Sequence, residues 1–200
     1  MSSTTNIILC GTGGQGILLA SEVVCAAALH SGFDVKKSEV HGMAQRGGSV
    51  SSHVRFGEKV YSVLVEQGTA HMVIALEKME GLRWAHFLRP GGRLVSADIR
   101  INPMTVNTGA AVYPDIDTRV SEGGVPCTEV PVLSIARDLG NYKVVNVALL
   151  GAASTLIEGI PLSSWERAIE ERVPPKALAV NIEAFNRGRA IPHRSKGAAS

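Results

Sequence analysis

The 200-residue sequence contains few aromatic residues and carries little net charge. Aromatic side chains make up 4% of the chain, which leaves few surfaces on which nucleic-acid bases stack. The formal net charge of +2 is too small for binding to phosphate backbones, which requires clustered lysine and arginine. Both deficits exclude nucleic acid as an expected partner.

Cysteine is also scarce, and the three cysteines, Cys10, Cys25 and Cys127, lie far apart without a Cys-x-x-Cys pair. Structural zinc sites and iron–sulfur clusters are built from closely spaced cysteines, so we expect no metal site and no such cofactor in this chain. Separate thiols are instead typical of a reducing compartment.

The sequence has no long hydrophobic run and no leader-like beginning. Its longest apolar stretch, residues 17–29, is interrupted by Ser21 and Glu22 and is shorter than the roughly 20 residues that span a bilayer. The first residues lack a basic region followed by an apolar core. We therefore expect no membrane contact and a cytoplasmic protein.

Glycine, by contrast, is abundant at 21 residues, and an apolar content of 45% is enough for a buried core. An apolar strand pattern over residues 6–10 leads into a glycine-rich turn and then into a helical segment that ends near Gly32. The turn consists of Gly11, Thr12, Gly13, Gly14, Gln15 and Gly16. A strand, a glycine turn and a helix in this order are typical of the first unit of an open α/β sheet.

Strand and helix patterns continue to alternate along the chain. Strand patterns occupy residues 33–40, 49–57, 59–65, 72–76, 93–99, 110–113 and 127–131, and helical patterns occupy residues 77–87, 132–139, 146–157, 164–172 and 175–186. They predict an α/β fold: a Rossmann-like, three-layer open sheet, mainly parallel, with an antiparallel hairpin of 49–57 and 59–65 and a helical C-terminal part. We expect one domain over residues 1–190 and a flexible tail over 191–200.

The glycine turn is the first candidate site. Gly11, Gly13 and Gly16 fit the pattern G-x-G-x-x-G, in which backbone amides approach a phosphate at a helix N-terminus. Glu39, near the end of the second strand, occupies the place of a ribose-binding acid. Two interpretations stay open at this point: a nucleotide or phosphate site, or a tight turn that packs on a neighbour.

The second candidate is the loop over residues 41–48, where glycines flank His41, Gln45 and Arg46. These side chains provide hydrogen-bond donors and a group that can transfer a proton. Because the loop follows the second strand, we expect it at the carboxyl edge of the sheet, facing the same crevice as the glycine turn. The alternative is a polar surface loop.

Other candidate residues favour structural roles. The chain has no Gly-x-Ser-x-Gly elbow and no P-loop lysine motif, so no nucleophile or P-loop phosphate site is indicated. We expect Glu77 and Glu80 on a solvated helix face, Asp115 and Asp117 in a loop turn rather than a cation site, and Asn146 as a helix cap. No catalytic residue is expected.

Two runs together resemble a known family. They are Gly11-Thr12-Gly13-Gly14-Gln15-Gly16 and Glu39-Val40-His41-Gly42-Met43-Ala44-Gln45-Arg46-Gly47-Gly48-Ser49-Val50. They resemble the gamma domain of the pyruvate and 2-oxoacid:ferredoxin oxidoreductases, and most of all the small (beta) subunits of the indolepyruvate type. Residues 146–152 and 165–169 are similar as well, and the resemblance covers nearly the whole chain except the tail.

The resemblance implies CoA-dependent oxidative decarboxylation of aryl pyruvates with thiamine diphosphate, iron–sulfur clusters and ferredoxin as electron acceptor. The family's Gly-Asp-Gly thiamine motif is missing here. The resemblance therefore implies that a large (alpha) subunit holds these cofactors in a heterotetramer and that this chain is inactive alone. A gamma subunit acting on pyruvate, 2-oxoglutarate or branched-chain 2-oxoacids is an alternative, as are a non-catalytic assembly subunit and a free-standing NAD-binding protein.

The two runs also supply the expected ligand-binding or partner-binding residues. These are Gly11, Gly13, Gly14, Gln15 and Gly16 in the turn, and His41, Met43, Gln45, Arg46, Gly47 and Gly48 in the loop.

Overall fold

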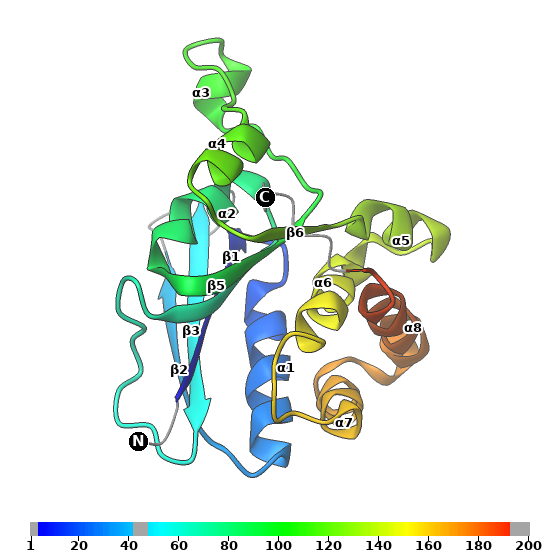
Figure 1. Ribbon diagram of the computed structural model, residues 1–200. Coiled ribbons are helices and arrows are strands. Elements are labelled where there is room, and N and C mark those ends of the chain that lie inside the picture. The colour runs from blue at the N-terminus through cyan, green and yellow to red at the C-terminus, as the bar shows by residue number, and fades with distance from the viewer. Residues whose placement is uncertain (1–3, 42–47, 193–200) are drawn as a thin grey trace.

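A computed structural model describes residues 4–41 and 48–192, with the backbone alone at residues 40 and 41. A six-stranded sheet lies between two layers of helices (Figure 1). The strands are β1 (Thr5–Thr12), β2 (Asp34–His41), β3 (Ser49–Gly57), β4 (Ala70–Ala75), β5 (Leu88–Ala97) and β6 (Cys127–Val130). The helices are α1 (Ile17–His30), α2 (Lys78–Trp84), α3 (Met104–Asn107), α4 (Ile116–Glu122), α5 (Val132–Asp138), α6 (Val145–Ser154), α7 (Leu162–Arg172) and α8 (Leu178–Arg189), with 3-10 turns η1 (Ala85–Phe87), η2 (Tyr142–Val144) and η3 (Pro175–Ala177).

The strand order is β2-β3-β1-β4-β5-β6. The neighbouring strands β1, β4, β5 and β6 run parallel to one another, whereas β3 runs antiparallel to both β1 and β2. The predicted open, mainly parallel α/β sheet is confirmed. The antiparallel strand is inserted between β2 and β1, and this insertion determines what can lie beside the glycine turn.

The prediction that residues 59–65 form a strand and pair with 49–57 is wrong. The antiparallel partner of β3 on this side is β2. Side chains of the sheet capture the backbone of this segment instead. Arg55 donates to the carbonyls of Ser62 and Leu64, and Asp34 accepts from the Val60 N–H. A backbone whose polar groups are satisfied by side chains needs no strand partner.

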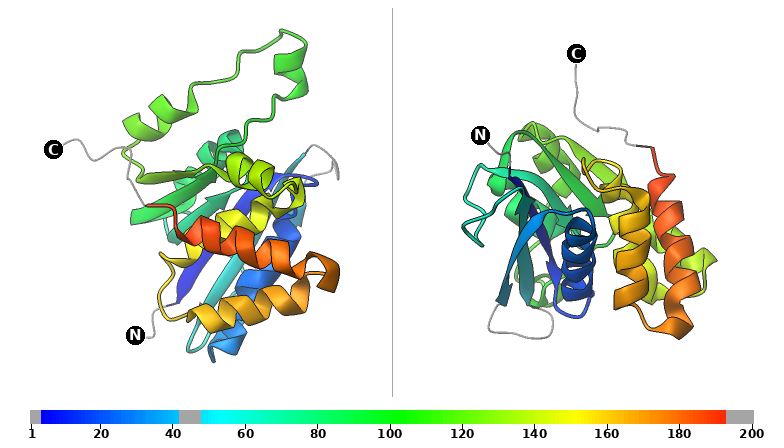
Figure 2. Two further views of the ribbon diagram at one scale, coloured as in Figure 1. Left: turned by 90° about the vertical axis from the view of Figure 1, so that its right-hand side faces the viewer. Right: turned by 90° about the horizontal axis from the view of Figure 1, so that it is seen from below.

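Helix α1 is apolar nearly all round because it is covered on both sides. Figure 2 shows it between the sheet and a second tier that contains α7 and α8. Its buried residues join those of β1, β3 and α6 to α8 in one large apolar cluster. A smaller cluster lies on the opposite face of the sheet, under α2 and α4.

One further local prediction is wrong. Residues 110–113 form no strand, because they belong to an excursion between β5 and α4 that contains α3. Residues 89–92, which follow the predicted helix at 77–87, are part of β5. Helix α7 begins at Leu162 after Pro161, and the Ser164 N–H donates to the Pro161 carbonyl.

The structure bears on the expectations about the C-terminal tail and about membrane contact. Helix α8 ends the regular structure at Arg189, and most of the predicted tail, residues 193–200, lies outside the described residues. Within the described part of the chain, no helix is long and apolar enough to cross a membrane.

Candidate functional site

The glycine turn follows β1 at the carboxyl edge of the sheet and leads directly into α1. Gly16 is the N-cap of α1 and adopts a left-handed conformation, with φ of 80°, and Gly14 has φ of 101°. Residues with a Cβ atom rarely adopt these angles, so both glycines are required by the path of the chain. The predicted strand, turn and helix are therefore confirmed, and the turn's function depends on its amides.

Much of the turn's hydrogen-bonding capacity is used internally. The Thr12 N–H donates to Gln15 Oε1 at 2.6 Å, and Gln15 Nε2 donates to the Leu76 carbonyl at 2.8 Å. A Cβ atom on Gly11 would lie 2.7 Å from Gln15 Oε1. Gly11 therefore makes room for the Gln15 side chain, which ties the turn to the end of β4.

Asn146 of α6 fixes the other end of the turn. Its Nδ2 donates to the Gly16 carbonyl at 3.1 Å, and a Cβ atom on Gly16 would collide with that same amide. Asn146 is 3% exposed and lies inside α6, so its prediction as a helix cap is wrong. The position of a polar amide within an apolar helix was the signal in the sequence for a tertiary contact.

The turn meets the last residue of the loop after β2. The Gly13 N–H donates to the Gly48 carbonyl at 2.9 Å, which joins the glycine turn to the start of β3. His41 ends β2, opposite Val50, so both ends of the loop lie at the carboxyl edge. Met43, Gln45, Arg46 and Gly47 lie outside the described residues.

The sheet order separates Glu39 from the glycine turn. Glu39 pairs with Ser52 of β3, and β3 lies between β2 and β1. A ribose-binding acid needs to follow the strand next to the glycine turn. Glu39 instead forms an ion pair with Lys37, with 2.6 Å between Glu39 Oε1 and Lys37 Nζ. The geometry disfavours a dinucleotide, since Gln15 fills the space over Gly11 and the acid lies one strand too far away.

A hollow of about 520 Å³ opens on the α1 side of the turn. It is lined by Gly14, Gly16 and Asn146, and by Lys143, which contributes a positive charge. The first-turn amides of α1 also lie at this end of the helix, where partial positive charge favours anions. This hollow combines the features that suit a phosphate or carboxylate group.

A second hollow of about 540 Å³ lies on the opposite side of the turn, against α2 and α3. Thr12, Gly48 and Ser49 line it from the sheet, and Glu77 and Glu80 line it from α2. Glu77 is 2% exposed and Glu80 is 6% exposed, so the prediction of a solvated face is wrong.

Glu77 is buried because its carboxylate organises the surrounding backbone. Its Oε2 accepts from the Glu80 N–H at the start of α2, and its Oε1 accepts from the Ile101 N–H at 3.1 Å and the Tyr113 hydroxyl at 2.7 Å. Burial and the neighbouring Glu77 charge raise the pKa of Tyr113. The signal for Glu77 in the sequence was its position directly after a buried strand, at the edge where such folds place polar groups.

Glu80 is held by a hydrogen bond and an ion pair. Its Oε2 accepts from the Ser49 hydroxyl at 2.5 Å, and its Oε1 lies 3.1 Å from Arg83. Asp115 accepts from the Thr118 N–H as the N-cap of α4, and Asp117 lies in the first turn of that helix, so the prediction of a loop turn at these two residues is wrong. These carboxylates therefore have structural partners.

Comparison with known proteins identifies the family. A model of the pyruvate ferredoxin/flavodoxin oxidoreductase family matches residues 6–191. The chain belongs to this family. It is 40% identical to the indolepyruvate oxidoreductase subunit IorB of Thermococcus kodakarensis, over 92% of this chain and 93% of that one, and 40% identical to the same subunit of Pyrococcus horikoshii with the same coverage. The resemblance of the two glycine-rich runs to the 2-oxoacid:ferredoxin oxidoreductases is thereby confirmed.

Solved structures of the family share the fold. The gamma subunit of a keto/oxoacid ferredoxin oxidoreductase from Geobacter sulfurreducens aligns with a TM-score of 0.68 at 24% identity, over 92% of this chain and 95% of that one. A 2-oxoglutarate:ferredoxin oxidoreductase from Magnetococcus marinus aligns with a TM-score of 0.73 at 21% identity, over 100% of this chain but 33% of that one. In that protein a longer chain contains the same fold.

The described part of this family member offers no donor set for a metal cofactor. No group of three or more His, Cys, Asp or Glu side chains within residues 4–41 and 48–192 could hold a metal ion. The cysteines lie on three different elements, β1, α1 and β6. Burial raises the pKa of the Cys10 thiol, and the nearby carboxylates raise it further, so this thiol stays protonated and unreactive.

Proposed function

We propose that this chain is the small subunit of an indolepyruvate ferredoxin oxidoreductase, and that it takes part in the CoA-dependent oxidative decarboxylation of aryl pyruvates in the cytoplasm. Graded similarity carries the proposal. Four relatives named indolepyruvate oxidoreductase subunit IorB are 33–40% identical, whereas three named 2-oxoglutarate synthase subunit KorC are 25–27% identical. Each match covers 92% of this chain, so the difference is distributed along the sequence.

On this proposal, thiamine diphosphate and the iron–sulfur clusters belong to a large (alpha) subunit. The two subunits form a heterotetramer that passes electrons to ferredoxin, and this chain is inactive alone. The lack of a metal-binding group among the described residues supports this division. Its own contribution is then to bind and position ligand or partner groups, with no covalent step.

The glycine turn and the loop at residues 41–48 form the face that this subunit presents to the active centre. The Gly13–Gly48 hydrogen bond supports this placement because it joins both segments at one edge, beside the two hollows. We propose ligand or partner contacts for the turn and for His41, Gln45 and Arg46. A guanidinium group at position 46 suits a carboxylate or a phosphate of CoA, which it can bind through two parallel hydrogen bonds.

Replacement of Arg46 tests this assignment in the reconstituted complex. With the large subunit, CoA and ferredoxin present, Arg46→Ala is expected to lower kcat/KM for indolepyruvate at least about tenfold, or about 1.4 kcal/mol, without reducing co-purification. The matched control is Arg137→Ala on the exposed side of α5. Unchanged kinetics in Arg46→Ala would contradict the site, and a preference for pyruvate or 2-oxoglutarate in a substrate panel would contradict the named substrate.

We infer that the excursion at residues 100–115, here called the arm, contacts the large subunit. The arm projects beyond the carboxyl edge of the sheet, with α3 at its tip (Figures 1 and 2). Its apolar side chains Ile101, Met104 and Val112 are 40%, 75% and 90% exposed. Exposed apolar side chains on a projecting segment favour a protein partner. The occurrence of this fold within longer family chains also supports contact with further protein at this unit.

A further inference from the structure

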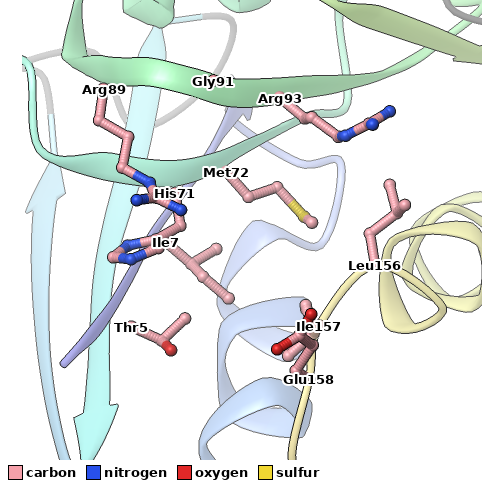
Figure 3. A pocket seen from close by; sticks show the side chains of 10 residues that line it. All are labelled: Thr5, Ile7, His71, Met72, Arg89, Gly91, Arg93, Leu156, Ile157 and Glu158. Carbon is pink, nitrogen blue, oxygen red and sulfur yellow. The ribbon is translucent and has the colours of Figure 1, made fainter. Parts of the chain in front are cut away.

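A small cavity lies at the amino edge of the sheet, at the opposite end from the glycine turn. Its volume is about 230 Å³, and β1, β4, β5 and the loop after α6 line it (Figure 3). Ile7 and Met72 are paired on neighbouring strands and form an apolar floor, and Arg93 is the register partner of Met72 on the next strand. Leu156, Ile157 and Glu158 cover it from the loop.

An irregularity in the sheet places arginines around this cavity. Ala70 pairs with Leu88 and Met72 pairs with Arg93, so residues 89–92 lie opposite the single residue His71. The insertion turns through Gly91, with φ of 75°. Extra residues in one strand redirect side chains that a regular ladder would space evenly. Here they place Arg89 and Arg93 at two ends of the cavity.

His71 is oriented by its neighbours so that it offers a hydrogen-bond donor. Its Nδ1 accepts from the Asn6 N–H at 3.1 Å, so in the neutral ring the proton is on Nε2. Asn6 is itself fixed by Arg55 and by the Thr69 carbonyl. Burial and the charge of Arg89 lower the pKa of His71, in keeping with the close approach of these side chains in Figure 3.

The two arginines of this cavity lack an ion-pair partner in the part of the chain that the structure describes. Neither Arg89 nor Arg93 forms an ion pair with a described carboxylate, whereas Lys36 and Lys37 of β2 each have such a partner. Glu158 is the one carboxylate that lines the cavity, and it is exposed on the rim. Figure 3 shows the Arg89 guanidinium beside His71, and the Arg93 guanidinium on the side towards Leu156.

We propose that this cavity binds a small aliphatic dicarboxylate, with one carboxylate at Arg89 and His71, the methylene chain over Ile7 and Met72, and the second carboxylate at Arg93. A guanidinium group binds a carboxylate through paired hydrogen bonds, and the His71 Nε2–H adds a third donor at the first end. The apolar floor between two cationic ends selects a hydrocarbon spacer with a negative charge at each end. This site is separate from the proposed active-centre face.

Calorimetric titration of the full chain at constant ionic strength tests the proposal. The probes are succinate, glutarate and adipate, each compared with the monocarboxylate of the same chain length. At least one dicarboxylate is expected to bind about tenfold or more tightly than its monocarboxylate counterpart, since the second ion pair forms only with the diacid. Equal affinities for the two, or no binding of any diacid up to about 10 mM, would overturn the proposal.

Four variants locate the bound ligand. Arg93→Gln is expected to reduce the affinity for the diacid to that of the monoacid, and Arg89→Gln to weaken both about tenfold or more. Glu158→Gln removes a repelling charge and should tighten diacid binding. Arg137→Gln, an exposed arginine on α5, is the matched control and should change nothing. An equal loss of affinity in Arg137→Gln and Arg93→Gln would show that binding depends only on the overall positive charge, and it would overturn the site. Circular dichroism verifies that each variant is folded.

Discussion

At the scale of single residues, the buried polar groups determine how this chain deviates from a simple α/β sheet. Glu77 connects α2, the arm and Tyr113 through hydrogen bonds to one carboxylate. His53 is 4% exposed and packs edge-on against the rings of Trp84 and Phe87. Both residues therefore make stability depend on contacts of buried polar side chains that no apolar pattern predicts.

The Tyr113 hydroxyl is expected to stabilise the base of the arm. Tyr113→Phe removes a hydrogen bond to the buried Glu77 carboxylate, a loss of about 1.5–3 kcal/mol in the free energy of unfolding. Chemical denaturation measures the loss, and limited proteolysis within residues 100–115 should become faster. Tyr142→Phe is the control, because Tyr142 is 65% exposed. Equal proteolysis of Tyr113→Phe and the wild type would contradict this role.

His53 is expected to make the fold sensitive to acid. Burial lowers its pKa in the folded chain below the ordinary value of 6.5. From about pH 6.5 downward the unfolded chain therefore binds more protons than the folded chain, and the stability contributed by neutral His53 is lost as the pH falls towards the lower, folded-state pKa. The loss is at most about 1.4 kcal/mol per pH unit for one group.

The measurement is the fall in Tm between about pH 7.5 and about pH 5.5, a range that spans the ordinary pKa of histidine. His53→Gln should show a smaller fall than the wild type, whatever its absolute Tm, while His86→Gln, at an exposed position, should show the same fall. His71, whose pKa is also lowered, keeps part of the dependence in both variants. An unchanged fall in His53→Gln would assign the sensitivity elsewhere.

At the scale of elements, α6 and α8 pack with their backbones in contact at two glycines. A Cβ atom on Gly151 would collide with the Phe185 carbonyl, and one on Gly188 would collide with the Ala148 carbonyl. The close approach is possible because neither glycine has a side chain. The small residues among 148–153, visible in the sequence, thus allow α8 to pack closely against α6.

Gly151→Ala is expected to destabilise the chain by about 3 kcal/mol or more, because two helices must move apart rather than one side chain. For a chain of this size, thermal unfolding should then occur about 6–12 °C lower. Gly123→Ala is the control: its backbone has φ of −72°, and the change should cost less than about 1 kcal/mol. A similar Tm for the two variants would show that α6 and α8 can adjust.

The elements themselves were largely predictable, whereas their order was not. The glycine turn, α1 and its stop at Gly32 follow local rules of backbone conformation, and the structure has them as predicted. Local patterns contain no information on which strand lies beside β1, so the insertion of β3 could not be predicted. The segment at 59–65 has strand-like composition, but the side chains of Arg55 and Asp34, which lie outside this segment, form hydrogen bonds with its backbone.

The candidate site was predictable to the same extent. The meeting of the glycine turn with Gly48 follows from both being at the ends of strands, which is a topological rule. The roles of Gln15 and Asn146 depend on side-chain contacts across the fold, with partners 61 and 130 residues away. A single sequence gives residue types at such positions but not the pairs that they form.

At the scale of the whole molecule, one edge of the sheet carries both the glycine turn and the arm. The two hollows beside the turn and the exposed apolar side chains of the arm lie at this carboxyl edge, while the dicarboxylate cavity lies at the amino edge. A large subunit that docks on the arm would therefore cover the hollow lined by both Gly48 and Met104. Assembly and completion of the site would then be one event.

A charge on the arm is expected to prevent this assembly while the subunit stays folded. Met104→Asp and Val112→Asp each place a carboxylate on an exposed apolar position, so desolvating it in an interface should reduce co-purification with the large subunit about tenfold or more, while the Tm stays within about 2 °C. Tyr61→Asp is the matched control, since Tyr61 is 91% exposed but lies in the segment between β3 and β4, away from the arm. If all three variants co-purify equally well, the arm is not the docking surface; if all three fail equally, the loss reflects surface charge rather than this edge of the molecule.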